Sequence, residues 1–410
     1  MKIHVEKLRQ ALRIVLPAVA KKATLPILQN VLVKDGRLYA SDLELQLSVP
    51  VPGLSGEAFT FPARQMTQTL ANLPGYELLE IGVGDNRLEL KTSRTTSSMQ
   101  GADAREFPLA TPTEPHEAEV DGDAFLAALG RVRPYAAKAV SRPILVGVCV
   151  GFGDRVTVVA ADGYRLAWDT LHLAIEPRNG IESIIIPSRA IDVLKATWRG
   201  APKAPALPAR DGPPHEASLN MAMLAVAERP MRLTFDKSSL SCHFGGVTLC
   251  TRLLEGTFPD YKSLIPSGQD KRVVVHAREV TQALRQLGPI SDDGNGIIRL
   301  SWNGQGMLMS AHAEDVGDSE VRLSCTSQGE AGNIAFNRRY LEEYFDGKDG
   351  WVMLEVTTPS SPGLFTCSGR ENLVLMPVFV DPRPPATTPG EHANGGGAAL
   401  NEEEPLAIDE

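Results

Sequence analysis

Four side chains of the kinds that bind divalent cations lie close together in the segment AHAEDVGDSE: His312, Glu314, Asp315 and Asp318. Imidazole and carboxylate groups at this spacing could hold a metal ion. The segment falls where a turn between two strands is expected, and acidic turns are usually only solvated. The chain has no P-loop, GxSxG, HExxH or GxGxxG motif. We therefore predict no enzymatic activity, metal or cofactor, and keep a metal-dependent enzyme using His312, Glu314 and Asp315 as an alternative.

A second kind of chemistry is offered by three apolar stretches: AADGYRLA (160–167), FPDYKSLIP (258–266) and LVLMPVFV (373–380). The first has the pattern of a strand, a two-residue Asp162-Gly163 turn and a second strand. We predict that the three stretches form one surface groove. A groove with a flexible Met at its centre suits short peptides from several partners. The alternative is an ordinary turn and an ordinary last strand.

Two units that would position these stretches each recur three times along the chain. The first is a short strand followed by a helix, at 2–12, 119–129 and 274–284. Apolar residues at i, i+3 and i+4 predict one buried stripe on each helix: Leu8, Ala11 and Leu12; Phe125, Ala128 and Leu129; Val280, Ala283 and Leu284. The second unit, at 61–70, 186–194 and 336–344, places Pro62, Pro187 or Asn337 at a helix start.

Three copies of these units predict three similar α+β domains, each with two helices packed on antiparallel sheet. We place them at 1–117, 118–268 and 269–380. The second contains a Pro-rich insert at about 200–227. The last stretch, 381–410, is rich in Pro, Gly and Glu, which predicts a disordered acidic tail.

Composition limits the compartment and the cysteine chemistry. The chain has 410 residues and a hydrophobic fraction of 43%, with no leader-like start and no apolar run long enough to span a membrane. We therefore expect a cytoplasmic protein with no membrane partner. The five Cys lack CxxC spacing and lie mostly in strand-like runs, so they are predicted to be buried free thiols.

The order of TLPILQN (24–30), RPILVGV (142–148), AADGYRLA, FPDYKSLIP and a final LMPVFV resembles the bacterial DNA polymerase III beta subunit, the DNA sliding clamp, across 1–380. The resemblance implies the DNA clamp fold and a head-to-tail homodimeric ring around double-stranded DNA. It also implies a processivity role, with the replicative DNA polymerase, an ATP-dependent clamp loader and other clamp-binding replication and repair proteins as partners. A non-enzymatic alternative is a second-copy clamp-like scaffold or an inhibitor-tolerant clamp variant.

Helix geometry and charge favour the same assembly. Six helices at a spacing of about 9 Å would enclose only about 17 Å, whereas twelve give about 35 Å, so two chains are needed. The six helix windows, 5–16, 62–73, 123–138, 187–199, 276–287 and 337–345, carry fourteen Lys and Arg against six Asp and Glu, while the whole chain has a net charge of −9. A basic hole within an acidic exterior suits phosphate contacts without sequence readout. The alternative is that these cations are ordinary solvated side chains.

The site residues follow from these arguments. Family positions imply that the partner-peptide groove consists of Leu145, Ala161, Gly163, Tyr164, Arg165, Leu166, Pro259, Ser263, Leu264, Val374, Leu375, Met376, Pro377 and Val378. The DNA-binding candidates are Lys22, Arg64, Arg131, Arg133, Arg142, Arg189, Lys195, Arg199, Arg285 and Arg339, of which Lys22 and Arg142 come from the resemblance.

Three departures from the family pattern bear on the groove. Tyr164 stands where His is usual, and Ser263 where a basic residue often lies. Phe379 and Val380 replace the usual terminal Arg-Leu pair. The groove is therefore predicted to be more apolar and less basic than in the family.

Overall fold

The computed structural model describes residues 1–22, 25–110, 116–138, 142–177, 180–201 and 229–379. Met1–Val378 form one compact unit. The predicted insert, from residue 202 onward, and the predicted tail 381–410 lie outside the described residues. The proposed domain boundaries stay predictions.

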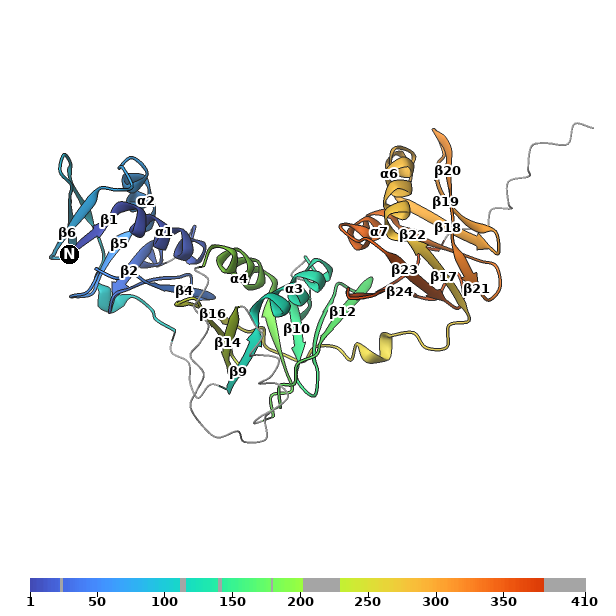
Figure 1. Ribbon diagram of the computed structural model, residues 1–410, viewed down its shortest axis with the longest axis horizontal. Coiled ribbons are helices and arrows are strands. Elements are labelled where there is room, and N and C mark those ends of the chain that lie inside the picture. The colour runs from blue at the N-terminus through green and yellow to red at the C-terminus, as the bar shows by residue number, and fades with distance from the viewer. Residues whose placement is uncertain (23–24, 111–115, 139–141, 178–179, 202–228, 380–410) are drawn as a thin grey trace, which may run out of the picture. The chain divides into compact units, whose positions relative to one another are not determined.

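The elements recur in three repeats (Figure 1). The first repeat contains β1 (Lys2–His4), α1 (Val5–Val15), β2 (Asn30–Lys34), β3 (Arg37–Ser41), β4 (Leu45–Pro50), β5 (Phe59–Pro62), α2 (Ala63–Ala71), β6 (Leu78–Gly84), β7 (Arg87–Lys91) and β8 (Thr96–Gln100). The second contains β9 (His116–Asp121), α3 (Gly122–Val132), β10 (Gly147–Gly151), β11 (Val156–Ala161), β12 (Arg165–Leu171), β13 (Ser183–Pro187), α4 (Ser188–Gly200), β14 (Pro230–Phe235), β15 (Ser239–Phe244) and β16 (Val247–Arg252).

The third repeat contains β17 (Lys271–His276), α6 (Ala277–Asp293), β18 (Ile297–Asn303), β19 (Gly306–Ala313), β20 (Gly317–Leu323), β21 (Thr326–Gln328), β22 (Gly332–Asn337), α7 (Arg338–Phe345), β23 (Trp351–Val356), β24 (Gly363–Cys367) and β25 (Asn372–Leu375). The predicted mixture of paired helices and antiparallel strands is confirmed. No helix in the described ranges is long and apolar enough to cross a bilayer.

The helices start and pack as their sequences predict. All nine residues of the predicted stripes on α1, α3 and α6 are buried. Pro62 and Pro187 occupy the N-caps of α2 and α4. Asn337 caps α7 by accepting a hydrogen bond from the Arg339 backbone N–H at 2.9 Å.

Four antiparallel sheets cover the buried helix faces, and two of them cross from one repeat to the next. One has the order β5-β2-β3-β4-β16-β15-β14-β9, and another β13-β10-β11-β12-β25-β24-β23-β17-β21. The junctions are β4–β16 and β12–β25. The remaining sheets, β1-β6-β7-β8 and β20-β19-β18-β22, each belong to a single repeat.

All five cysteines are free thiols, as predicted; four are buried and Cys325 is half-buried. A second tight hairpin joins β6 to β7. Asp85 and Asn86 have φ of 49° and 58°, the left-handed values that a tight hairpin turn requires.

A buried ion pair lies in the third repeat and reaches the second. The Lys348 ammonium donates to Glu371 Oε1 at 2.5 Å, and the Tyr135 hydroxyl donates to the same oxygen at 3.2 Å. Lys348 and Glu371 are only 6% and 4% exposed. Burial lowers the pKa of Lys348, and the Glu371 carboxylate opposes that shift. The pair therefore ties the turn before β25 to the second repeat.

We predict that Glu371→Ala lowers the free energy of unfolding by about 3–5 kcal/mol, because it leaves the Lys348 ammonium buried without its counter-ion. Denaturant titration with circular dichroism measures the change. The double variant Lys348→Met/Glu371→Leu removes both charges and should recover most of the loss. A double variant as unstable as Glu371→Ala would contradict this account.

Candidate functional site

The hairpin between β11 and β12 presents its turn through an Asx motif. Asp162 Oδ1 accepts hydrogen bonds from the backbone N–H groups of Tyr164 and Arg165, at 3.0 and 3.1 Å. The Asp162 N–H donates to the Arg165 carbonyl, so the two turn residues are Gly163 and Tyr164. The predicted Asp162-Gly163 turn is therefore displaced by one residue. Gly163 takes the left-handed position, with φ of 95°, and Tyr164 is exposed at the tip.

Arg165 fixes this hairpin to the third repeat. Its Nε donates to Asp162 Oδ2 at 2.8 Å, and its Nη1 donates to Glu343 Oε2 of α7 at 2.5 Å. The guanidinium also lies over Tyr340 and Tyr135, at 4.4 and 5.1 Å from the ring centroids. Burial disfavours the charged form, but the two carboxylates outweigh it and raise the pKa of Arg165. Arg165 is thus a buried positioning residue, whereas the sequence placed it on the groove surface.

The last strand continues the same sheet past the hairpin tip. β25 pairs with β12 so that Leu166 lies opposite Val374. Beyond the strand, the Met376 N–H donates to the Tyr164 carbonyl at 2.9 Å. The segment that ends the third repeat therefore runs along the turn of the second, as the groove prediction requires.

A small apolar cluster lies beneath these two segments. It contains Leu145, Leu166 and Val374 from the predicted groove. They are joined by Phe258, which begins the predicted stretch 258–266, and by Leu364, which the sequence did not single out. The half-buried Ala161 packs against it. Pro259, Ser263, Leu264 and Met376 are exposed, and Pro377 and Val378 are half-buried. The structure thus brings four of the predicted groove residues, Leu145, Ala161, Leu166 and Val374, together in one buried floor.

Leu375 is placed differently from the prediction. Its side chain is fully buried and belongs to the main core rather than to the cluster under the groove. Alternation along a strand explains the difference, because neighbouring side chains point to opposite faces of a sheet. Val374 therefore faces the groove floor while Leu375 faces the core.

The DNA-binding candidates separate into two groups. Lys22, Arg64, Arg142, Lys195, Arg199 and Arg285 make no ion pair within the described ranges. The other four form ion pairs: Arg131 with Asp169, Arg133 with Asp192, Arg189 with Asp42 and Arg339 with Glu343. Arg142 lies beside the groove hairpin, since a Cβ on Gly163 would stand 2.8 Å from its Nη1.

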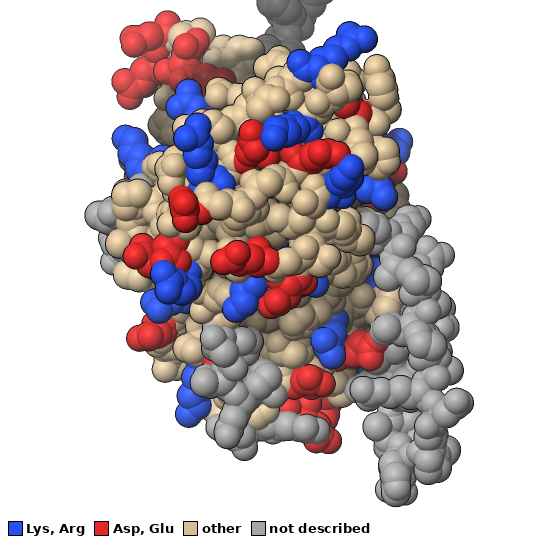
Figure 2. All heavy atoms as spheres, turned by 90° about the vertical axis from the view of Figure 1, so that its left-hand side faces the viewer, with Lys and Arg blue, Asp and Glu red and all other residues tan. Residues whose placement is uncertain are grey.

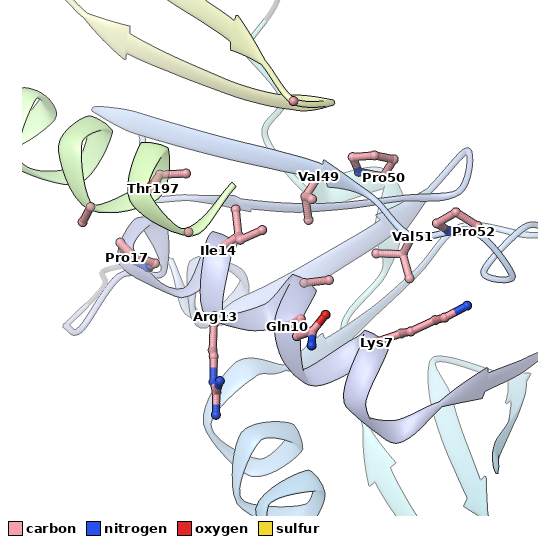
Figure 3. Close-up of a pocket in the computed structure, with 14 residues that line it drawn as sticks. Lys7, Gln10, Arg13, Ile14, Pro17, Val49, Pro50, Val51, Pro52 and Thr197 are labelled. Atoms are coloured by element: carbon pink, nitrogen blue, oxygen red, sulfur yellow. The ribbon is translucent and has the colours of Figure 1, made fainter. Parts of the chain in front are cut away.

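A cleft of about 780 Å³ lies between the first and second repeats. Lys7, Gln10 and Arg13 extend from the exposed side of α1 along it, and its apolar wall includes 49–52 at the end of β4 (Figure 3). Lys7 and Arg13 are absent from the predicted DNA-binding set. Their place on the exposed stripe of an amphipathic helix was the signal that could have identified them.

Two further arginines are absent from the predicted DNA-binding set, because they lie outside the helices. Arg229 precedes β14, and Arg370 lies in the turn between β24 and β25. Both line a hollow of about 470 Å³ next to α3 and α4, together with Arg131, Lys195 and Arg199. No helical pattern marks either residue, so only the fold brings them to this surface.

The segment around His312 forms the end of the β19–β20 hairpin. His312 Nδ1 and Asp318 Oδ1 face each other across the two strands at 2.8 Å. Glu314 and Asp315 lie in the connecting turn. In the part of the chain that the structure describes, no three His, Cys, Asp or Glu side chains are grouped as metal ligands.

Comparisons with known proteins support one family. Residues 262–374 match the family model of the DNA polymerase III beta subunit, C-terminal domain. The chain is 26% identical to the beta sliding clamp of Synechococcus elongatus, over 91% of this chain and 97% of the relative. It is 26% identical to the beta sliding clamp of Pseudomonas putida, over 92% and 98%.

Solved structures agree in fold. The DNA polymerase III subunit beta of Pseudomonas aeruginosa superposes with a TM-score of 0.79 at 22% identity, covering 93% of this chain and all of that one. The beta subunit of Thermotoga maritima gives a TM-score of 0.76 at 22% identity, covering 92% and 99%.

We predict that Leu375→Ala mainly lowers stability, whereas Met376→Ala mainly weakens peptide binding. Leu375→Ala removes a core side chain and should lower the free energy of unfolding by about 2–5 kcal/mol. Met376→Ala removes an exposed side chain and should change it by less than about 0.5 kcal/mol, while weakening a peptide in the groove. Denaturation and fluorescence anisotropy with a labelled clamp-binding peptide measure the two effects. Unchanged peptide affinity in Met376→Ala would place the groove elsewhere.

Proposed function

This chain belongs to the DNA polymerase III beta subunit family, and from that membership we propose that it acts as a DNA sliding clamp. Two copies form a closed ring around double-stranded DNA without reading its sequence, and an ATP-dependent clamp loader opens and loads the ring. The groove beside Tyr164 and Met376 tethers the replicative DNA polymerase and other replication and repair proteins. The protein works in the cytoplasm as a processivity factor and performs no catalysis.

The observation that carries the ring is the way in which the repeats are joined. Each repeat contains two units of four neighbouring strands. In the first, second and third repeat, one unit ends in β4, β12 and β20, and the other unit ends in β8, β16 and β25. Both junctions join the two kinds of end, as β4–β16 and β12–β25. Within the described residues, β20 and β8 have no such partner. If β20 of one copy pairs with β8 of another copy, the same kind of junction forms between the two chains. Such pairing closes a head-to-tail ring.

Surface charge at the N-terminal end fits a contact between proteins. Lys, Arg, Asp and Glu side chains are interspersed on the end of the molecule that β1 and β6 border (Figures 1 and 2). A surface that binds DNA through its phosphates would instead concentrate one sign of charge. This end therefore suits a subunit interface better than a DNA-binding face.

We predict that Ser98→Pro breaks the ring. The Gly101 N–H donates to the Asn86 carbonyl, which makes these two residues a hydrogen-bonded pair. Hydrogen-bonded and non-hydrogen-bonded pairs alternate along β7 and β8, so Ser98 lies in a non-hydrogen-bonded pair and its N–H points away from β7. Proline there removes a donor to a partner strand and spares the internal ladder. Light scattering should show the mass of one chain instead of two, and retention on nicked circular DNA after loading should be lost.

The matched control is Glu119→Pro. The bond from the Gly122 N–H to the Arg229 carbonyl places the Glu119 N–H on the outer side of edge strand β9, which has no role in the proposed closure. Glu119→Pro should remain dimeric and be retained. For the unsubstituted protein, cutting a loaded circle should release it. Retention on linear DNA with free ends at moderate salt would show that binding is not topological.

A further inference from the structure

The cleft between the first and second repeats has the size and the walls of a small-molecule site. Its volume is about 780 Å³, and ligand pockets commonly hold about 300–1,000 Å³ and lie where domains meet. Ile14 of α1 and the end of β4, at 49–52, form an apolar wall. α4 lines the cleft with the small residues Ala196, Thr197 and Gly200. A Cβ on Gly200 would meet nothing within 4 Å, so the space beside α4 is open.

Lys7 provides a positive charge that the protein does not neutralise. It is exposed and makes no ion pair within the described residues. No Asp or Glu is among the described residues that line the cleft. The Lys7 side chain extends towards Val51 and Pro52 (Figure 3). An anionic group held against that part of the wall would therefore gain a charged partner without competing with a carboxylate.

Thr197 provides an unused hydrogen-bond donor in the same cleft. It is 5% exposed, and its Oγ1 is buried with no hydrogen-bond partner in the described chain. Its side chain points from α4 into the cleft, on the side of Ile14 (Figure 3). A buried hydroxyl without a partner carries a desolvation cost, so a ligand oxygen that accepts from Thr197 would recover part of that cost.

The two polar groups are spaced for a molecule of limited length. Lys7 and Ile14 both belong to α1, and a rise of about 1.5 Å per residue separates them by about 10 Å along the helix. A ligand that reaches from Lys7 to Thr197 therefore spans about two helical turns. The apolar residues Val49 and Val51 lie along this span.

This combination of walls distinguishes between classes of ligand. A row of phosphates would use the cation but would gain nothing from an apolar wall. A wholly apolar molecule would fill the wall but leave the charge of Lys7 and the hydroxyl of Thr197 unused. The cleft therefore suits a molecule that has both an apolar body and polar ends.

We propose that the cleft between α1 and α4 binds a small amphipathic anion, a flat apolar body with a carboxylate at one end and an oxygen acceptor at the other. The body packs on Ile14 and 49–52, the carboxylate accepts from the Lys7 ammonium, and the second oxygen accepts from the Thr197 hydroxyl. This site does not depend on the proposed clamp function, because its ligand is neither DNA nor a partner protein.

The test is fluorescence titration of the full-length protein with 6-hydroxy-2-naphthoate, which carries a carboxylate and a hydroxyl at opposite ends of a flat apolar body. Binding should saturate at one molecule per chain. Lys7→Gln should weaken it about tenfold, because the carboxylate loses its charged partner. The uncharged 6-hydroxy-2-naphthamide should bind both proteins equally. The control Lys22→Gln removes an exposed cation of the same repeat that does not line the cleft, and should change nothing.

Thr197→Val separates recognition from damage to the fold. Valine has nearly the same shape and removes the buried hydroxyl, so the melting temperature should rise while 6-hydroxy-2-naphthoate binds about fivefold more weakly. The analogue 2-naphthoate, which lacks the hydroxyl, should bind both proteins equally. A variant with a damaged fold would instead lose stability and affinity together.

Ala196→Trp locates the bound molecule. Ala196 is exposed and lines the cleft, so a large side chain should fill the space without entering the core, and binding should be lost at an unchanged melting temperature. A clamp-binding peptide, which occupies the groove beside Tyr164, should not displace the naphthoate. Displacement by the peptide, or undiminished affinity in Lys7→Gln or Ala196→Trp, would overturn the proposal. Absence of saturable binding would overturn it as well, while retention on circular DNA tests the clamp function separately.

Discussion

Main-chain pairing between repeats is the constraint on which the rest of the structure depends. The register of β12 and β25 places Leu166 opposite Val374, so the floor beneath the groove is assembled from two repeats. Because side chains alternate along a strand, a slip of one residue would exchange Val374, which faces this floor, with Leu375, which fills the core. The same pairing leaves β8 and β20 as the free ends from which a closed ring can be built.

Buried charged side chains add to the strand pairing at the segments whose orientation they fix. Arg165 is 5% exposed, yet it reaches a carboxylate of its own hairpin and one on α7. Lys348 and Glu371 likewise form a buried ion pair, which holds the turn before β25. Removing such groups from water costs several kcal/mol each, and an apolar replacement can be as stable. We infer that their value lies in orientation, since each pair fixes the segment that carries the hairpin tip or the start of β25.

Sequence reasoning succeeded where the cause is local. The helices and their buried stripes follow from apolar spacing within about a dozen residues, and the starts of α2, α4 and α7 follow from Pro62, Pro187 and Asn337. It failed where the cause is distant. The junctions β4–β16 and β12–β25 join strands that no local pattern connects, and the burial of Leu375 depends on that register. The Asp162-Gly163 turn was displaced because Asx bonding, rather than the dipeptide, sets the tip.

The number of Lys and Arg residues in the sequence differs from the number of cations that the fold leaves unpaired. The helix windows contain an excess of Lys and Arg, but four of the ten candidate cations are already paired with carboxylates. An ion-paired guanidinium offers a phosphate less than a free one, because contact must compete with the existing partner. The number of candidate cations that are free to meet a phosphate is therefore smaller than the count of positive residues suggests. A small number of contacts means weak binding with a shallow dependence on salt, because each phosphate contact adds about 0.9 to the slope of log affinity against log salt. Weak contacts that ignore the bases let a protein hold DNA and still move along it.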